Sequence, residues 1–155
     1  MTWITPDIAD ERGDAVDSCA LAFRQFGGRT SFTGAIRTVR CHEDNLLLRT
    51  ELNSPGDGAV LVVDGGGSTR RALMGDLVAA AAVENGWAGV IVHGVIRDSV
   101  LIGGMQVGVA ALGTNPKPPA KTGAGELDVP VAFGGVTFTP GRTVWCDPDG
   151  VLVEI

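Results

Sequence analysis

The sequence predicts a single α/β domain with a βαβ centre and mixed sheets. Two apolar strand-like runs, residues 59–64 and 88–94, enclose an alanine-rich helical segment, and several short β-forming runs follow toward the C-terminus. The chain has 155 residues and 45% apolar residues. A chain of this length can bury roughly two-thirds of its unfolded surface in one core. We therefore expect residues 1–155 to form one domain.

The elements before the centre are short. Residues 5–26 are compatible with one or two short helices, and residues 33–39 alternate between small or polar and apolar side chains, which is typical of a strand. Residues 43–52 have helical character and end at the turn of residues 53–56. Residues 59–64 form the clearest buried strand of the sequence, because they contain four consecutive valine or leucine residues.

The central helix and strand bring distant residues together. The alanines after Asp76 favour a helix of about three turns, which Asn85-Gly86 would end, and residues 88–94 form the next strand. A helix of about 11 residues runs about 16 Å, and a strand of about five to six residues returns about 16 to 20 Å. Because the two lengths nearly cancel, we expect Arg97-Asp98 to lie beside Gly75 and Asp76.

The C-terminal third is expected to be mostly antiparallel β structure. Its short β-forming runs are residues 107–112, 129–133, 136–138, 143–146 and 151–155. Between the first two of these, residues 114–123 are expected to form a loop. Three prolines within four positions, Pro116, Pro118 and Pro119, exclude this segment from a central strand.

Composition excludes several classes of function. The formal net charge is −6 and the sequence pI is about 4.7, so we expect no direct binding of nucleic acid and no attraction to anionic membranes. The three cysteines are far apart and lack the spacing of a zinc site or a secreted disulfide framework. The N-terminal residues reach proline and aspartate before a long apolar run can form, which argues against a signal peptide or membrane anchor. We expect a cytoplasmic protein.

A glycine-rich segment, Asp64-Gly65-Gly66-Gly67-Ser68, follows the clearest strand. Glycines let backbone amides approach an anion closely, so the segment invites a nucleotide-binding interpretation. However, it matches neither the P-loop nor the dinucleotide-binding pattern, and it resembles only loosely the loop of S-adenosylmethionine methyltransferases. A structural turn or a wall of a substrate pocket is the favoured interpretation.

The residues around Asp76 predict a site for a small carboxylate. Alone, Asp76 would be a helix N-cap, and Arg97-Asp98 would be a surface ion pair. Together, the free amides of Gly75, Asp76, Leu77 and Val78 can bind a carboxylate, and Arg97 can add a bidentate clamp. Asp98 can then hold Mg²⁺ or Mn²⁺, because such ions keep several waters and take further oxygens from the substrate.

Other chemistry finds little support in the sequence. Zinc is disfavoured because His42 and His93 are the only histidines and no His/Cys cluster exists. His93 follows the second strand and could face the pocket, although a core histidine is the more common case. No Ser/His/Asp arrangement is evident, and no lysine lies between Met74 and Asp98 to form a Schiff base. Metal-assisted chemistry remains.

Five segments spread over nearly the whole chain form a recognisable set: residues 26–32 (FGGRTSF), 62–68 (VVDGGGS), 82–87 (AVENGW), 94–98 (GVIRD) and 133–138 (FGGVTF). Together they resemble one family, that of the regulator of ribonuclease activity A (RraA-like proteins) and the class II 4-hydroxy-4-methyl-2-oxoglutarate aldolases. The resemblance implies a β/β/α swivelling-domain fold, assembled as a homotrimer with sites between subunits.

The resemblance also implies specific site residues. The aldolase signature is an acidic residue, twenty intervening residues and then Arg-Asp, which Asp76, Arg97 and Asp98 satisfy. Ribonuclease-regulating members lack the aspartate of that pair, so its presence here favours an enzyme. The dedicated aldolases are longer, and their C-terminal extension lends an acidic side chain to a neighbouring site. The present sequence stops at Glu154-Ile155, a difference that bears on efficiency and preferred substrate.

The resulting hypothesis is a divalent-metal-dependent lyase acting on a small 2-oxo acid. It would cleave 4-hydroxy-4-methyl-2-oxoglutarate to pyruvate by a retro-aldol reaction, with secondary oxaloacetate decarboxylase activity through the same pyruvate enolate. Asp98 would hold the metal, Arg97 would stabilise the developing oxyanion, and Asp76 would orient a water molecule for proton transfer. The alternative is a non-catalytic inhibitor of a ribonuclease E-type partner. A methyltransferase is a third and weaker possibility.

Overall fold

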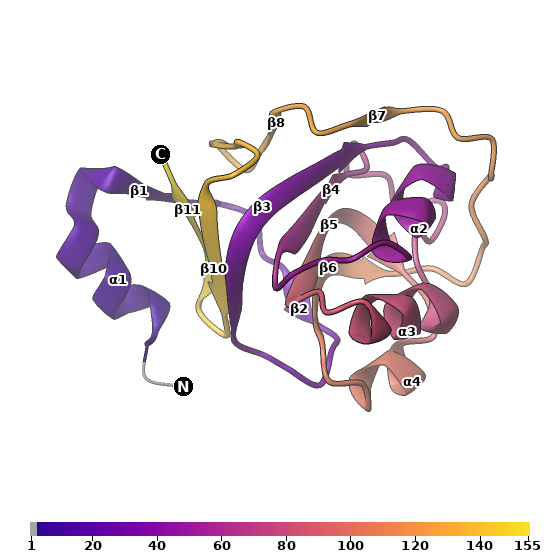
Figure 1. The fold of residues 1–155 in the computed structure, drawn as a ribbon, viewed down its shortest axis with the longest axis horizontal. Coiled ribbons are helices and arrows are strands. Elements are labelled where there is room, and N and C mark those ends of the chain that lie inside the picture. The colour runs from indigo at the N-terminus through magenta and orange to yellow at the C-terminus, as the bar shows by residue number, and fades with distance from the viewer. Residues whose placement is uncertain (1–2) are drawn as a thin grey trace.

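The computed structural model describes residues 3–155 (Figure 1). Met1 and Thr2, which belong to the predicted domain and to the stretch where no signal peptide is expected, lie outside the described residues. The helical elements are α1 (Thr5–Arg12), the short 3-10 helix η1 (Gly13–Ala15), α2 (Leu46–Leu52), α3 (Asp76–Glu84) and α4 (Ser99–Gly103). The strands are β1 (Val16–Ser18), β2 (Arg24–Gln25), β3 (Phe32–Arg40), β4 (Val60–Asp64), β5 (Gly89–Ile96), β6 (Gly108–Thr114), β7 (Glu126–Leu127), β8 (Val131–Phe133), β9 (Val136–Phe138), β10 (Thr143–Asp147) and β11 (Gly150–Glu154).

One large mixed sheet organises the molecule. It has nine strands, eight of them in the order β1-β11-β10-β3-β4-β5-β6-β2, and β7 pairs with β3. The central strands β3, β4, β5 and β6 are parallel to one another, and the flanking strands pair antiparallel. A separate antiparallel hairpin is formed by β8 and β9. The predicted α/β class with a βαβ centre and mixed sheets is confirmed.

Strands β4 and β5 and the first half of β6 are buried on both faces, which accounts for their nearly continuous apolar sequences. One face packs against α2, α3 and α4, with Leu48, Ala79 and Ile102 among the helical residues of this core. The other face packs against the β8–β9 hairpin and the β10–β11 pair, through residues such as Phe138 and Val144. Figure 1 shows the three helices together on one side of β3–β6 and α1 at the opposite end, beside β1 and β11. This layering matches the implied β/β/α arrangement.

Several elements differ from the sequence-based expectations. Residues 5–26 were expected to form one or two short helices, but only residues 5–15 are helical, and strands β1 and β2 follow. The run at residues 107–112 was assigned to the mostly antiparallel half, but β6 pairs parallel with β5 and extends the central sheet. Helix α4 was not predicted at all. It begins after Asp98, whose left-handed backbone (φ 57°, ψ 38°) turns the chain directly from the end of β5 into a helix. Aspartate is among the few residues that adopt this conformation readily.

None of the helices within residues 3–155 is long and apolar enough to cross a membrane.

Candidate functional site

The candidate site lies where β5 ends and α3 begins. Because β4 and β5 are parallel, their carboxyl ends lie at the same edge of the sheet, and the chain that leaves β4 starts α3 there. The Leu73 amide donates to the Val95 carbonyl at 2.9 Å, and the Arg97 amide donates to the Met74 carbonyl at 3.0 Å. The segment before α3 therefore runs beside the end of β5.

This pairing brings Gly75 against Asp98. The Asp98 Oδ2 atom accepts a hydrogen bond from the Asp76 amide at 3.0 Å. A Cβ atom at Gly75 would lie 2.4 Å from the same oxygen. Glycine is needed here for close approach rather than for an unusual backbone, since its φ is −132°. Asp98 thus supplies the carboxylate that caps α3, although it lies 22 residues away in sequence.

The capping arrangement changes one sequence-based expectation. The Asp76 amide was expected to be free for a substrate, but Asp98 already occupies it. Asp76 is also not the N-cap residue, because Gly75 holds that position and makes no side-chain cap. The amides of Gly75, Leu77 and Val78 donate no hydrogen bond to any atom within residues 3–155. Three of the four expected amides therefore remain available to an anion.

A cavity of about 220 Å³ opens at this junction. All six residues predicted for the site line it: Gly75, Asp76, Leu77, Val78, Arg97 and Asp98. The sequence did not predict the other lining residues, which are Asn45, Arg49, Ala72, Met74, Pro119 and Lys121. The side chain of Val78 is buried in the core and that of Leu77 is 79% exposed. Hence these two residues contribute chiefly backbone to an anion site.

Three cations and two carboxylates face each other in the cavity. Arg49, Arg97 and Lys121 carry positive charge, and Asp76 and Asp98 carry negative charge. None of the ion pairs found in the described chain involves these three cations. The Arg97 guanidinium makes only a long contact, 3.4 Å, to the Pro116 carbonyl. The cationic groups are therefore available to an incoming anion.

Asn45 adds a polar atom to the cavity wall. Its side chain is only 5% exposed, and its Nδ2 donates to the Leu73 carbonyl at 3.0 Å. Its Oδ1 is buried and accepts no hydrogen bond within residues 3–155. The Leu73 carbonyl fixes the orientation of the amide, because the opposite orientation would set two oxygens against each other. A buried acceptor without a donor is uncommon and marks this wall as a candidate contact for a ligand.

Asp44 joins two walls of the cavity. Its buried carboxylate accepts hydrogen bonds from the Thr122 hydroxyl and amide and from the Gly123 amide. Burial alone would raise the pKa of Asp44, but these hydrogen bonds and one from the Leu46 amide outweigh it, so the pKa lies below its ordinary value. The carboxylate thereby ties the loop that carries Lys121 to the start of α2.

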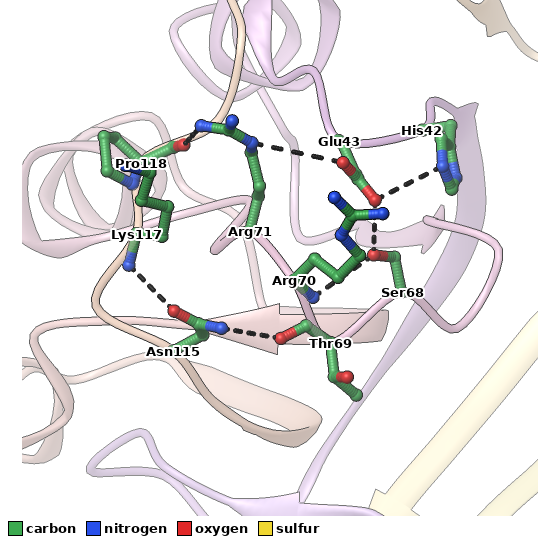
Figure 2. A network of polar contacts seen from close by, with 9 residues as sticks. All are labelled: His42, Glu43, Ser68, Thr69, Arg70, Arg71, Asn115, Lys117 and Pro118. Atoms are coloured by element: carbon green, nitrogen blue, oxygen red, sulfur yellow. Dashed lines mark hydrogen bonds and ion pairs between the residues drawn. The ribbon is translucent and has the colours of Figure 1, made fainter.

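A second polar network lies near the cavity (Figure 2). Glu43 accepts a hydrogen bond from the Ser68 hydroxyl at 2.8 Å and lies 4.0 Å from the Arg71 guanidinium. Arg71 donates in turn to the Pro118 carbonyl at 3.0 Å. The hydrogen bond from Ser68 is the main cause that lowers the pKa of Glu43. Figure 2 shows that this network connects three segments, at residues 42–43, 68–71 and 115–118. Cavity-lining residues follow each of them closely in sequence, at Asn45, Ala72 and Pro119.

The glycine-rich segment is engaged in internal contacts. The amides of Gly65 and Gly67 both donate to the His93 carbonyl at 3.1 Å. The Gly66 amide donates to the Asp64 carboxylate at 3.0 Å. All three amides are satisfied within the chain, so this loop offers no cradle for a phosphate or a sulfonium cofactor. The structural-turn interpretation of the segment is the one that the hydrogen bonds support.

His93 belongs to this packing rather than to the cavity. Its ring stacks on Phe133 with centroids 4.5 Å apart, and its Nδ1 lies 3.4 Å from the Asp64 carboxylate. The cysteines are likewise in the interior and unpaired. Burial raises the pKa of Cys41 and of Cys146 to about 12.

The donor set at the cavity fits a hard divalent cation. Within residues 3–155 no group of three or more His, Cys, Asp or Glu side chains could enclose a metal. The cavity offers instead the carboxylates of Asp76 and Asp98. Only one oxygen of Asp98, Oδ2, accepts the hydrogen bond of the helix cap, which leaves Oδ1 without a hydrogen bond inside the described chain. An ion that retains waters and takes substrate oxygens suits such a site, whereas structural zinc does not.

Comparisons with known proteins point to one family. The family model described as RraA-like, Aldolase/RraA, matches residues 5–153. A structure from Geobacillus kaustophilus named S-adenosylmethionine:2-dimethylmenaquinone methyltransferase shares 49% identity at a TM-score of 0.97, covering 98% of this chain and 94% of that one. The RNA-processing inhibitor RraA from Thermus thermophilus shares 44% identity at a TM-score of 0.96, with coverages of 99% and 93%.

A more distant relative has the same fold. The Streptomyces coelicolor protein RraAS2, named an unusual member of the RNase ES inhibitor RraA family, shares 29% identity at a TM-score of 0.76. The match covers 96% of this chain and 76% of that protein. A family that includes both lyases and ribonuclease inhibitors is thus defined over nearly the entire sequence. The chain belongs to the RraA-like, Aldolase/RraA family.

Proposed function

We propose that this protein is a divalent-metal-dependent lyase that cleaves 4-hydroxy-4-methyl-2-oxoglutarate to two molecules of pyruvate. The observation that carries the proposal is the single cavity in which Arg97 and the free amides of α3 lie beside the carboxylates of Asp76 and Asp98. Cationic and amide donors suit the carboxylate of a 2-oxo acid, and the two aspartates suit a hard cation.

Each group has a role in the proposed reaction. Arg97 and the amides of Gly75, Leu77 and Val78 hold the 2-oxo acid end of the substrate. Asp98 would hold Mg²⁺ or Mn²⁺, and the bound ion would supply Lewis-acid stabilisation of the keto oxygen worth several kcal/mol. Arg97 donates to the oxygen on which negative charge develops, and loss of such a donor typically costs about 3 to 4 kcal/mol. Asp76 orients a water molecule that takes the proton of the substrate hydroxyl.

The same residues serve a second reaction. Retro-aldol cleavage breaks the bond between C3 and C4 and leaves the enolate of pyruvate on the 2-oxo acid half. Decarboxylation of oxaloacetate breaks the bond to its distal carboxylate, releases CO₂ and leaves the same enolate. Protonation of that enolate gives pyruvate in both cases. We therefore expect oxaloacetate decarboxylase activity at this site as well.

The test is pyruvate release from both substrates, followed by coupled oxidation of NADH. We expect a rate that depends on Mg²⁺ or Mn²⁺, falls to the protein-free baseline with EDTA, and is lost in Asp98→Ala and Arg97→Ala. Arg29→Ala is the matched control, because Arg29 is exposed and does not line the cavity. An undiminished rate in Asp98→Ala contradicts the metal role of that residue.

We also expect a homotrimer in which the cavity lies near a subunit boundary. Large apolar side chains are exposed beside it, with Leu77 79%, Val100 90% and Leu101 59% accessible in the single chain. Burial of such side chains by another copy would remove an apolar patch from water. Light scattering should give three times the chain mass, and a monomer at micromolar concentration contradicts this expectation.

The second candidate function is inhibition of a ribonuclease. Its support is the 44% identity to a Thermus thermophilus protein named as an RNA-processing inhibitor. The net charge of −6 would favour binding of this protein to a basic segment of such an enzyme. Ribonuclease inhibition that survives Arg97→Ala, in a protein without lyase activity, would favour this function over the first.

A methyltransferase function has the name of the Geobacillus kaustophilus relative in its favour. The hydrogen bonds of the glycine-rich loop argue against it, since the Gly65, Gly66 and Gly67 amides are already satisfied. Calorimetry with S-adenosylmethionine decides the point, and the lyase proposal predicts no binding.

A further inference from the structure

Arg49 enters the cavity from a different element than the other anion-binding groups. It belongs to α2, whereas the amides come from the start of α3 and Arg97 follows β5. Two leucines of the same helix, Leu48 and Leu52, are fully buried in the core and fix the position of α2. Asn45, just before α2, is bonded to the Leu73 carbonyl in the segment that leads to α3. The Arg49 side chain thus extends from a fixed wall.

The charges in the cavity are unbalanced in favour of cations. A substrate with one carboxylate, held by Arg97, would leave Arg49 and Lys121 without a negative partner among residues 3–155. A bound divalent cation would offset the two negative charges of Asp76 and Asp98, so the positive charges of the three cationic side chains would remain. A second carboxylate on the substrate would reduce the remaining excess from two positive charges to one, and would give a second cationic side chain a negative partner.

We propose that Arg49 is a specificity-determining residue that binds the second carboxylate of a 2-oxo dicarboxylic acid whose 2-oxo acid end lies at Arg97. The assignment rests on the proposed function for the placement of that 2-oxo end. Arg49 suits this task better than Lys121, because a guanidinium can bind a carboxylate through two parallel hydrogen bonds. Lys121 lies on the loop of residues 115–123 and serves as the comparison.

The experiment measures binding, so that it does not depend on turnover. Calorimetry in buffer with Mg²⁺ compares 2-oxoglutarate with 2-oxopentanoate, in which a methyl group replaces the distal carboxylate. The proteins are the unaltered chain, Arg49→Met, Arg49→Lys and Lys121→Met. Arg29→Met is the control, because it removes the same charge from an exposed position outside the cavity.

We expect the unaltered protein to bind 2-oxoglutarate about tenfold more tightly than 2-oxopentanoate, the lower range for a charge-assisted hydrogen bond. Arg49→Met should remove this preference by weakening only 2-oxoglutarate, Arg49→Lys should retain part of it, and Arg29→Met should leave it intact. Equal binding of both ligands, binding of neither, or a preference that persists in Arg49→Met and disappears in Lys121→Met overturns the proposal. Tight, Arg49-dependent binding without pyruvate release would refute the lyase function but not this assignment.

Discussion

The close approach of Asp98 to the backbone of Gly75 predicts the effect of Gly75→Ala. The added Cβ atom would lie 2.4 Å from the Asp98 Oδ2 atom and 3.4 Å from Cγ of Arg97. Backbone strain plays no part, because the φ of −132° at Gly75 is accessible to alanine. The Asp98 carboxylate must therefore move, and its hydrogen bond to the Asp76 amide, 3.0 Å long, is lost or stretched. The substitution thus removes the cap of α3 without touching either aspartate.

The magnitude follows from the value of a helix cap. Loss of a side-chain N-cap costs typically about 1 kcal/mol of stability. A charged acceptor near the positive end of the helix dipole adds about 0.3 to 1 kcal/mol. We expect Gly75→Ala to lower the free energy of unfolding by about 1 to 2 kcal/mol. Displacement of Asp98 should also weaken binding of the metal, by roughly ten- to a hundredfold.

Urea unfolding and the Mg²⁺ dependence of pyruvate release measure the two effects. Gly113→Ala is the matched control, since a Cβ atom there would meet only Cγ1 of Val95 at 3.9 Å, an ordinary contact. If Gly75→Ala unfolds at the urea concentration of the control and needs no more Mg²⁺, Asp98 does not lie against α3 in the way described, and the reasoning fails.

Three further predictions rest on other contacts. Asp98→Asn keeps an acceptor for the helix cap but loses the charge, so the free energy of unfolding should fall by no more than about 1 kcal/mol while metal-dependent activity is lost. A loss of stability as large as that in Gly75→Ala would mean that the role of the carboxylate is structural. The pKa of Asp44 is lowered in the folded protein. Its stabilising contribution is complete above its unfolded pKa of about 3.9 and is lost as the pH falls through the folded value. Asp44→Asn should therefore destabilise the protein in urea titrations at neutral pH, by an amount that shrinks below about pH 4. The thiols of Cys41 and Cys146, buried and with pKa values of about 12, should react with a disulfide reagent only after unfolding; rapid labelling of the folded protein would contradict their burial.

The sequence was sufficient to predict the centre of the fold because its signals there are local. Apolar runs mark β4 and β5, and the Asn85-Gly86 stop ends α3 where the structure ends it, at Glu84. The matching lengths of helix and strand then place Arg97 and Asp98 at the start of α3, which a single hydrogen bond to the Asp76 amide verifies. The directions and lengths of α3 and β5 were therefore sufficient to predict that Arg97 and Asp98 lie at the start of α3.

The remaining wall of the cavity could not be predicted in this way. Asn45, Arg49 and Lys121 reach it through contacts between segments that are far apart in sequence, such as the hydrogen bonds from Thr122 to Asp44. No periodicity or turn signal specifies such a contact. Helix α4 was missed for a different reason, because its start depends on the left-handed backbone of Asp98, which the sequence permits but does not require.

The sheet edge offers two glycine-containing segments that could bind an anion, and hydrogen bonding decides between them. In the loop after β4, the amides of Gly65, Gly66 and Gly67 all donate hydrogen bonds to oxygens of the same chain. The start of α3 uses only one of its amides, that of Asp76, and retains three that point at no internal acceptor. Unsatisfied amides at a helix N-terminus favour an anion, whereas satisfied ones do not. The Asp76 amide donates its hydrogen bond to Asp98, the same carboxylate that we propose as the metal ligand. This one contact therefore fixes both the start of α3 and the position of Asp98 beside the anion site.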